Sequence, residues 1–269
     1  MSTVTTRLPV EAAPAPAGFR RWLGTTMRIA QLELRLFLRE PAVAVGLVAF
    51  PAVTVLILAG VFGSTPESEF AGVAPSQHYV VGYIGVVLAH MGLVVLPVHV
   101  ASSRELGVVR RYRAAGVSSV SLLASHAVVG AVLGVAASAI VLVVGASVYD
   151  VAAPDSSLGV AAWVAAGVVC FVALGIALGT LMPSSRAANA VGNLLFVPMF
   201  LLGGGGPPRE VMTGPMQALS DVLPLTHIIG GLRESWLGAT DDPQALWWTV
   251  LVTAVAVGLA VRSARRRAD

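Results

Sequence analysis

Arginine supplies all the basic side chains of this sequence apart from histidine, and one short segment holds four of them. Residues 102–121 read SSRELGVVRRYRAAGVSSVS, with four arginines and one glutamate, and they lie between two long apolar runs. Guanidinium groups form bidentate hydrogen bonds with carboxylates, so such a segment suits contact with a polar protein surface. We therefore expect residues 102–121 to be gripped by a partner outside this chain.

Histidines are the remaining candidates for proton or metal chemistry within the apolar runs. Those runs carry no Asp, Glu, Arg or Lys in their apolar bodies, but they contain His90, His99 and His126. Transporters driven by protons usually bury a titratable charge, so a histidine relay remains an alternative to hydrogen-bonded packing. The three histidines share no metal-ligand spacing, and no nucleophile–base pair is visible. We predict no catalytic residue and no metal site.

The absence of lysine excludes a P-loop nucleotide-binding motif from this chain. All 17 basic residues are arginines, whereas a P-loop needs the lysine of GxxxxGK[ST]. The glycines at 203–206 are followed by two prolines and do not form a phosphate cradle. If ATP drives this protein, a separate polypeptide hydrolyses it, and ATP and Mg belong to that partner. We expect this chain to bind no cofactor.

The composition predicts an all-α integral membrane protein. Of 269 residues, 56% are hydrophobic and 12% are charged, and the mean hydropathy is +0.83. Soluble domains have about 25% charged residues. Six apolar runs have the length of membrane spans, about 20 residues each. They are approximately Ala42–Gly63, Tyr79–Ala101, Leu122–Val148, Gly159–Met182, Ala187–Gly204 and Gln244–Val261.

The placement of arginine predicts the orientation of these spans. Fifteen arginines fall on one side of the membrane, while two arginines and nine of the fourteen acids fall on the other. Cytoplasmic loops carry the excess of basic residues, so both termini and residues 102–121 are expected in the cytoplasm. We predict a multi-pass protein of the cell membrane.

The segments flanking the spans have distinct expected roles. Residues 1–18 are rich in Pro, Ala and Thr and are predicted to be a disordered tail, and residues 263–269 are predicted to be a basic tail. Residues 19–40 repeat Arg21, Arg28 and Arg35 every seven positions, which predicts an amphipathic interfacial helix, with a simple positive flank as the alternative. The outer connection 206–243 predicts two short re-entrant helices broken at Pro224, or else a surface loop with helical turns.

Small residues recur at helical spacing in the third and fourth runs. Gly130 and Gly134 share one face, and Gly167, Gly175 and Gly179 share another. Such faces let helices approach closely, so we interpret both as packing surfaces.

Two further faces combine aromatic and polar residues. In the second run these residues are Tyr79, Tyr83 and His90; in the fifth run they are Asn189, Asn193, Phe196 and Phe200. Polar groups facing lipid are costly, so both faces should point at protein or at a water-filled path. A dimer seam and a substrate path both fit this pattern, and the two can coincide.

With these features in place, the chain resembles the permease subunits of type-2 ABC exporters over roughly residues 20–262. The sequence Arg104-Glu105-Leu106-Gly107, followed by Arg110 to Arg113 and by Ala115-Gly116-Val117-Ser118, is similar to that family's E-x-G … R … P-V-S hinge, with Gly116 where the family often has proline. The segment from Leu223 to Arg233 is similar to the family's outer signature before the last span.

The resemblance implies a partner ATPase and a second permease, either another copy or a paralogue. It makes residues 102–120 a coupling helix and residues 19–40 a connecting helix, within one transmembrane domain spanning 19–262. The implied ATPase contacts are Arg28, Arg35, Arg39, Glu40, Arg104, Glu105, Gly107, Arg110, Arg111 and Arg113. The implied substrate path follows the dimer seam, along the two polar-aromatic faces. We expect the protein to contact membrane lipid and to bind no nucleic acid.

The expected activity is export of a hydrophobic or amphiphilic substrate, a drug-like molecule or a lipid, with efflux and antibiotic resistance as possible consequences. A polysaccharide or glycolipid exporter is the alternative within the family, and the 6% aromatic content argues weakly against it. A proton-coupled or passive transporter and a membrane enzyme or structural anchor are the competitors from other classes.

Overall fold

The structure is a computed structural model, which describes residues 18–39, 41–66, 70, 73–238 and 243–265. Within these ranges the regular structure is entirely helical. The elements are α1 (Phe19–Leu38), α2 (Pro41–Phe62), α3 (Pro75–His90), the π-helical turn η2 (Met91–Val95), α4 (Leu96–Glu105), α5 (Val108–Ala114), α6 (Ser119–Val148), α7 (Ser157–Leu181), α8 (Ser185–Leu202), the 3-10 turn η3 (Arg209–Val211), α9 (Gly214–Ser220), α10 (Pro224–Leu237) and α11 (Pro243–Arg265).

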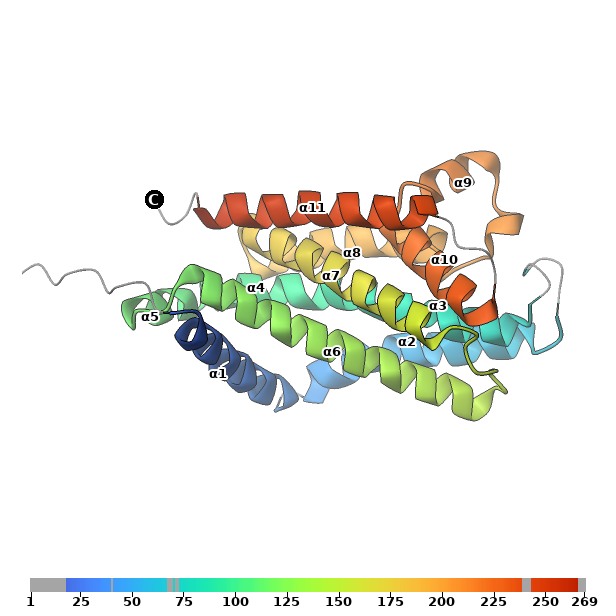
Figure 1. Cartoon of the computed structure of the whole chain (residues 1–269), viewed down its shortest axis with the longest axis horizontal. Helices are drawn as coiled ribbons and strands as arrows, with labels where there is room; N and C mark the ends of the chain where they lie inside the picture. Colours follow the sequence, from blue (N-terminus) through green and yellow to red (C-terminus); the bar gives the residue numbers. More distant parts are fainter. Residues whose placement is uncertain (1–17, 40, 67–69, 71–72, 239–242, 266–269) are drawn as a thin grey trace, which may run out of the picture.

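Five of the described helical segments are long and apolar enough to cross a membrane: the continuous α3–η2–α4 segment, α6, α7, α8 and α11. Helix α2 matches the first predicted span. Its apolar stretch Ala49–Phe62 is shorter than the five candidate spans and is not counted among them. The all-α membrane class is therefore confirmed, with five candidate spans, and the sixth stays a prediction. The long helices run alongside one another in a bundle (Figure 1).

The α3–η2–α4 segment lies at the centre of the bundle. It is 31 residues long, and 83% of its most apolar window is buried inside the chain. It contacts α2, α6, α7, α8 and α10. A π turn inserts one extra residue into a helix, and here it comes directly before Pro97, which lacks the N–H that an α-helix would use. The central helix is thus interrupted at its middle but not broken.

Glycines allow neighbouring backbones to approach this π turn. A methyl group added at Gly92 would lie 2.3 Å from the carbonyl oxygen of Phe171 on α7, and one added at Gly175 would lie 2.4 Å from the carbonyl oxygen of Gly92. Both contacts are too close for any larger residue. The interpretation of the Gly167–Gly175–Gly179 face as a packing surface is confirmed, because all three glycines lie against the α3–α4 segment.

The two ends of the bundle differ in what they carry. Helix α5, the beginning of α1 and the end of α11 lie at one end, and α9 and α10 lie at the other (Figure 1). Helix α1 packs on α6 through Ile29 and Ala30 and leaves Leu32 and Leu36 exposed. It has the expected separation of basic and apolar side chains, while its position at a membrane interface stays a prediction.

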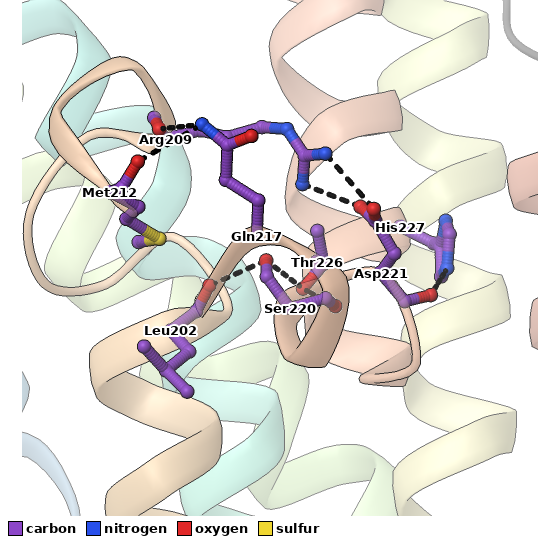
Figure 2. A network of polar contacts seen from close by, with 8 residues as sticks. All are labelled: Leu202, Arg209, Met212, Gln217, Ser220, Asp221, Thr226 and His227. Atoms are coloured by element: carbon purple, nitrogen blue, oxygen red, sulfur yellow. Dashed lines mark hydrogen bonds and ion pairs between the residues drawn. The ribbon is translucent and has the colours of Figure 1, made fainter. Parts of the chain in front are cut away.

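The predicted outer connection forms two helices that meet at Pro224, which begins α10. Helix α10 buries Ile228, Ile229 and Leu232 against the bundle, whereas α9 leaves Met216 and Leu219 exposed. The turn between them is held by hydrogen bonds (Figure 2). Depth within a membrane, and so the re-entrant character, stays a prediction.

Four expectations fall wholly or partly on residues outside the described ranges. The predicted disordered tail lies there except for Gly18, and so does Glu40. Residues 239–242 of the outer connection and residues 266–269 of the basic tail also lie outside the described part.

Candidate functional site

Helix α5 is a short arginine-bearing helix that protrudes from one end of the bundle. None of its residues is buried, and its neighbours in the fold are α4 and α6. Gly107 precedes it with φ of +70°, and Gly116 follows it with φ of +79°. Glycine adopts this left-handed conformation without the cost that other residues meet. The chain therefore turns sharply on both sides of α5 and presents it outward.

The arginines around α5 have different surroundings. Arg110 and Arg111 are exposed, and Arg113 is exposed but donates from Nε to Ser119 Oγ at 3.1 Å. Arg104, at the end of α4, is half-buried and donates from one terminal nitrogen to the carbonyl oxygens of Gly179, Thr180 and Met182, at 2.6, 3.0 and 3.2 Å. These are terminal carbonyls of α7, which have no partner within their own helix.

Arg104 and Glu105 thus connect the α4 end to two neighbouring helices. Glu105 is exposed and hydrogen-bonds the hydroxyl and backbone N–H of Ser185, the first residue of α8. A carboxylate is favoured at a helix N-terminus, as a guanidinium is at a C-terminus. Contact of both residues with a partner stays a prediction, and within the chain the guanidinium of Arg104 joins α4 to α7.

The remaining predicted partner contacts are on α1 and beside it. Arg28, Arg35 and Arg39 are all exposed. Tyr112 of α5 lines a groove of about 350 Å³ together with α1 residues Glu33, Leu36 and Phe37. Burial, and then the negative charge of Glu33, raise the pKa of Tyr112. The groove therefore separates the predicted connecting helix from the predicted coupling helix.

The two polar-aromatic faces meet inside one chain. The rings of Tyr83 and Phe200 lie 6.2 Å apart, and those of His90 and Phe196 lie 5.1 Å apart. Tyr79 and Tyr83 are buried, and the Tyr83 hydroxyl donates to the carbonyl oxygen of Gly205 at 3.1 Å. These two tyrosines are core residues of the monomer.

Another part of the same region is exposed on the surface of the chain. Asn189 and Asn193 are exposed on α8, where the Asn193 amide donates to the carbonyl oxygen of Asn189 at 2.9 Å and also to its side chain. Phe50 of α2 joins the cluster, with its ring 5.9 Å from Phe200 and 6.0 Å from His90, while 44% of the residue remains exposed. Sequence periodicity did not find Phe50, because a lone aromatic residue in an apolar run carries no signal.

A half-buried arginine at the far end was also missed as a structural residue. Arg233 of α10 donates to the carbonyl oxygen of His78 at 3.2 Å and to that of Gly204 at 2.8 Å. It ties α10 to the start of α3 and to the glycine turn after α8. The sequence alone predicts Arg233 only as part of an outer motif.

The turn beside it is fastened by polar contacts between η3, α9 and α10 (Figure 2). Both guanidinium nitrogens of Arg209 bind the carboxylate of Asp221, which raises the pKa of Arg209. The Gln217 amide donates to the carbonyl oxygens of Arg209 and Met212, each at 3.1 Å, and Ser220 Oγ donates to that of Leu202 at 2.8 Å. Side-chain hydrogen bonds therefore hold this end of the molecule in a defined conformation.

Comparison with known proteins agrees with this architecture. The family model described as "ABC-2 type transporter" matches residues 26–237. A Bacillus subtilis (strain 168) protein named "Putative transport permease YvfS" is 30% identical over 122 residues, which are 45% of this chain and 48% of that protein. The matched stretch spans about half the length of that curated relative. The family match covers most of the chain, from α1 to the end of α10, and the chain therefore belongs to the ABC-2 type transporter family of membrane permeases.

Proposed function

We propose that this chain is the membrane-spanning subunit of an ATP-driven exporter whose ATPase is a separate polypeptide. The observation that carries the proposal is α5, a helix with no buried residue that presents arginines at one end of a membrane bundle. A helix that buries nothing contributes little to its own fold, and its exposed Arg110 and Arg111 suit contact with another protein's carboxylates. The family match and the missing P-loop lysine support the same reading.

The contacts of the α4 end suggest how force would pass into the membrane. A partner that displaces α5 would also displace the two helices connected to it, α4 and α6. Helix α4 continues through η2 into α3. The hydrogen bonds of Arg104 would transmit the displacement to the end of α7, and those of Glu105 would transmit it to the start of α8. Helices are rigid and move as levers, so a small displacement at α5 would shift the bundle.

The cargo path is proposed to follow the exposed side of α2 and α8, where a second permease would close it. This side carries the rings of Phe50 and Phe200, with Phe196 buried against both, and the exposed amides of Asn189 and Asn193. Exposed amides are costly against lipid tails, which favours a protein or cargo neighbour. A surface of rings and two amides fits an amphiphilic molecule. Both termini and α5 are proposed to face the cytoplasm, the side with the arginine excess.

The proposal predicts that exposed α5 arginines are needed for ATPase binding. The double variant Arg110→Glu, Arg111→Glu should lose co-purification of the partner ATPase, with at least about a tenfold weaker complex, because charge pairs buried in an interface cost about 2–5 kcal/mol when one partner is altered. The measurement is pull-down and ATP hydrolysis of the detergent-purified complex.

Arg262→Glu is the matched control, since Arg262 is an exposed arginine on α11, a helix that ends at the same end of the bundle as α5. It should retain the ATPase. Full binding and transport by the α5 double variant would contradict the coupling role of α5. Transport that persists without any ATPase and collapses with the proton gradient would instead favour a proton-coupled transporter.

A further inference from the structure

Three helices bring two histidines and a glutamate together beside the α1–α5 groove. Glu33 comes from α1, His99 from α4 and His126 from α6. Each offers one ligand atom, and these atoms all lie within 4.8 Å of one another. The carboxylate oxygens of Glu33 lie 3.7 Å from His99 Nε2 and 3.6 Å from His126 Nε2, and the two ring centroids lie 5.3 Å apart.

Several polar atoms of this cluster have no hydrogen-bond partner, or only a long one. Ser103 Oγ donates its proton to the carbonyl oxygen of His99 at 2.7 Å, and Ser125 Oγ donates to that of Leu122 at 2.8 Å. Ser125 Oγ also reaches Glu33 Oε1 at 3.4 Å, and Ser103 Oγ lies 3.3 Å from His126 Nε2; both contacts are longer than the bonds of these hydroxyls to the carbonyl oxygens. One Glu33 oxygen and His99 Nε2 are buried and make no hydrogen bond. The possible ligand atoms from three helices thus lie within 4.8 Å of one another, and His126 Nδ1 is also buried without a hydrogen-bond partner.

A buried carboxylate needs a cation, because burial disfavours its charge. Among the described residues, the basic groups within ion-pair distance of Glu33 are the two histidine rings. Separations of 3.6 and 3.7 Å are too long for good hydrogen bonds. They are close to the separation of about 3.4 Å between two ligands of one tetrahedral zinc ion, with zinc–nitrogen and zinc–oxygen bonds of about 2.1 Å.

We propose that Glu33, His99 and His126 bind a divalent transition-metal ion of the zinc class. Two imidazoles and one carboxylate favour zinc over magnesium or calcium, which prefer oxygen ligands. The groove of about 350 Å³ is lined by Glu33 and His99, so it gives the ion a route to the site and leaves a fourth position for water. The bound ion would join α1 to α4 and α6 next to α5.

The test uses the full chain, purified in detergent and stripped with a chelator. Zn²⁺ added to it should bind at one ion per chain by calorimetry, and Co²⁺ should give the visible spectrum of a tetrahedral site. His99→Gln and Glu33→Gln should each weaken zinc binding by at least about 100-fold, the upper range seen even for residues that only support metal ligands. Zinc should also raise the Tm of the unmodified chain and leave that of His99→Gln unchanged.

His227→Gln is the matched control, because His227 is on α10 at the other end of the bundle and contacts the carbonyl oxygen of Asp221. It should bind zinc normally. His99 is 35% exposed, so its variant tests the site even if a change at the buried Glu33 impairs folding. No saturable binding at micromolar Zn²⁺, or equal binding by the His99→Gln variant, would overturn the proposal and leave the cluster as a packing contact between two histidines and a glutamate.

Discussion

At the scale of single residues, arginines of the same local sequence do different work. Arg104 and Arg111 are seven positions apart in one arginine-rich segment. Arg104 satisfies three carbonyl oxygens at the end of α7, whereas Arg111 is exposed. Charge counting treats the two alike, since it registers only that both are basic. Their neighbours in space separate a structural arginine from a candidate partner contact.

This difference predicts opposite effects of two substitutions. Arg104→Gln should lower the free energy of unfolding by about 1–3 kcal/mol, because terminal carbonyls of α7 lose a charged donor in a half-buried place. Arg111→Gln should change it by less than about 0.5 kcal/mol, as surface substitutions usually do. Thermal unfolding of the two purified variants checks this, and equal stability of both would refute the assigned role of Arg104.

At the scale of elements, the central feature is the interrupted helix α3–η2–α4. The proline at position 97 explains the place of the interruption, and the glycines on α7 explain how neighbouring backbones fit around it. This helix connects the glycine turn and Arg233 at one end to Arg104 and Glu105 at the other. It is the element through which a displacement at α5 would reach the rest of the bundle.

The close packing at the π turn gives a prediction about Gly92. In Gly92→Ala the new methyl group would meet backbone atoms of Phe171 at 2.3 to 2.6 Å, and backbone cannot rotate away as a side chain can. The expected loss of stability is about 3 kcal/mol, the upper end for overpacking.

Gly258→Ala on α11 is the control, because a Cβ there has no neighbour within 4 Å. This change should be neutral or raise stability by up to about 1 kcal/mol, since alanine favours a helix interior. Thermal unfolding measures both variants, and a Gly92→Ala protein as stable as the unmodified chain would show that α3 and α7 can separate at little cost.

At the scale of the whole molecule, exposed polar groups on a membrane bundle indicate which side is covered by something else. The α8 side presents Asn189 and Asn193, while the exposed side of α6 presents apolar residues such as Val132 and Val135. Lipid is a good neighbour for the second side and a poor one for the first. The proposed seam with a second permease therefore lies along α8.

Cross-linking distinguishes these two sides. Cys170 is buried, so replacing it with alanine gives a background without reactive thiols among the described residues. In membranes, Asn193→Cys should then cross-link to a second permease through a short bifunctional thiol reagent, and Val132→Cys should not. Cross-links at both positions, or only at Val132, would place the seam elsewhere.

The sequence by itself determined the helical membrane class, the positions of the long helices within a few residues, the turn at Pro224 and the arginine-rich segment that contains α5. These follow from local causes: apolar runs of span length, proline and glycine as breaks, and charge that cannot enter lipid. Only the tertiary structure decided that Arg104 faces α7 and that Tyr79 and Tyr83 belong to the core. It alone also brought His99, His126 and Glu33 together, because ligands drawn from three different helices have no common spacing along the chain. Contacts between distant residues depend on how helices pack against one another. The sequence pattern within each helix does not show which residues of two helices will meet.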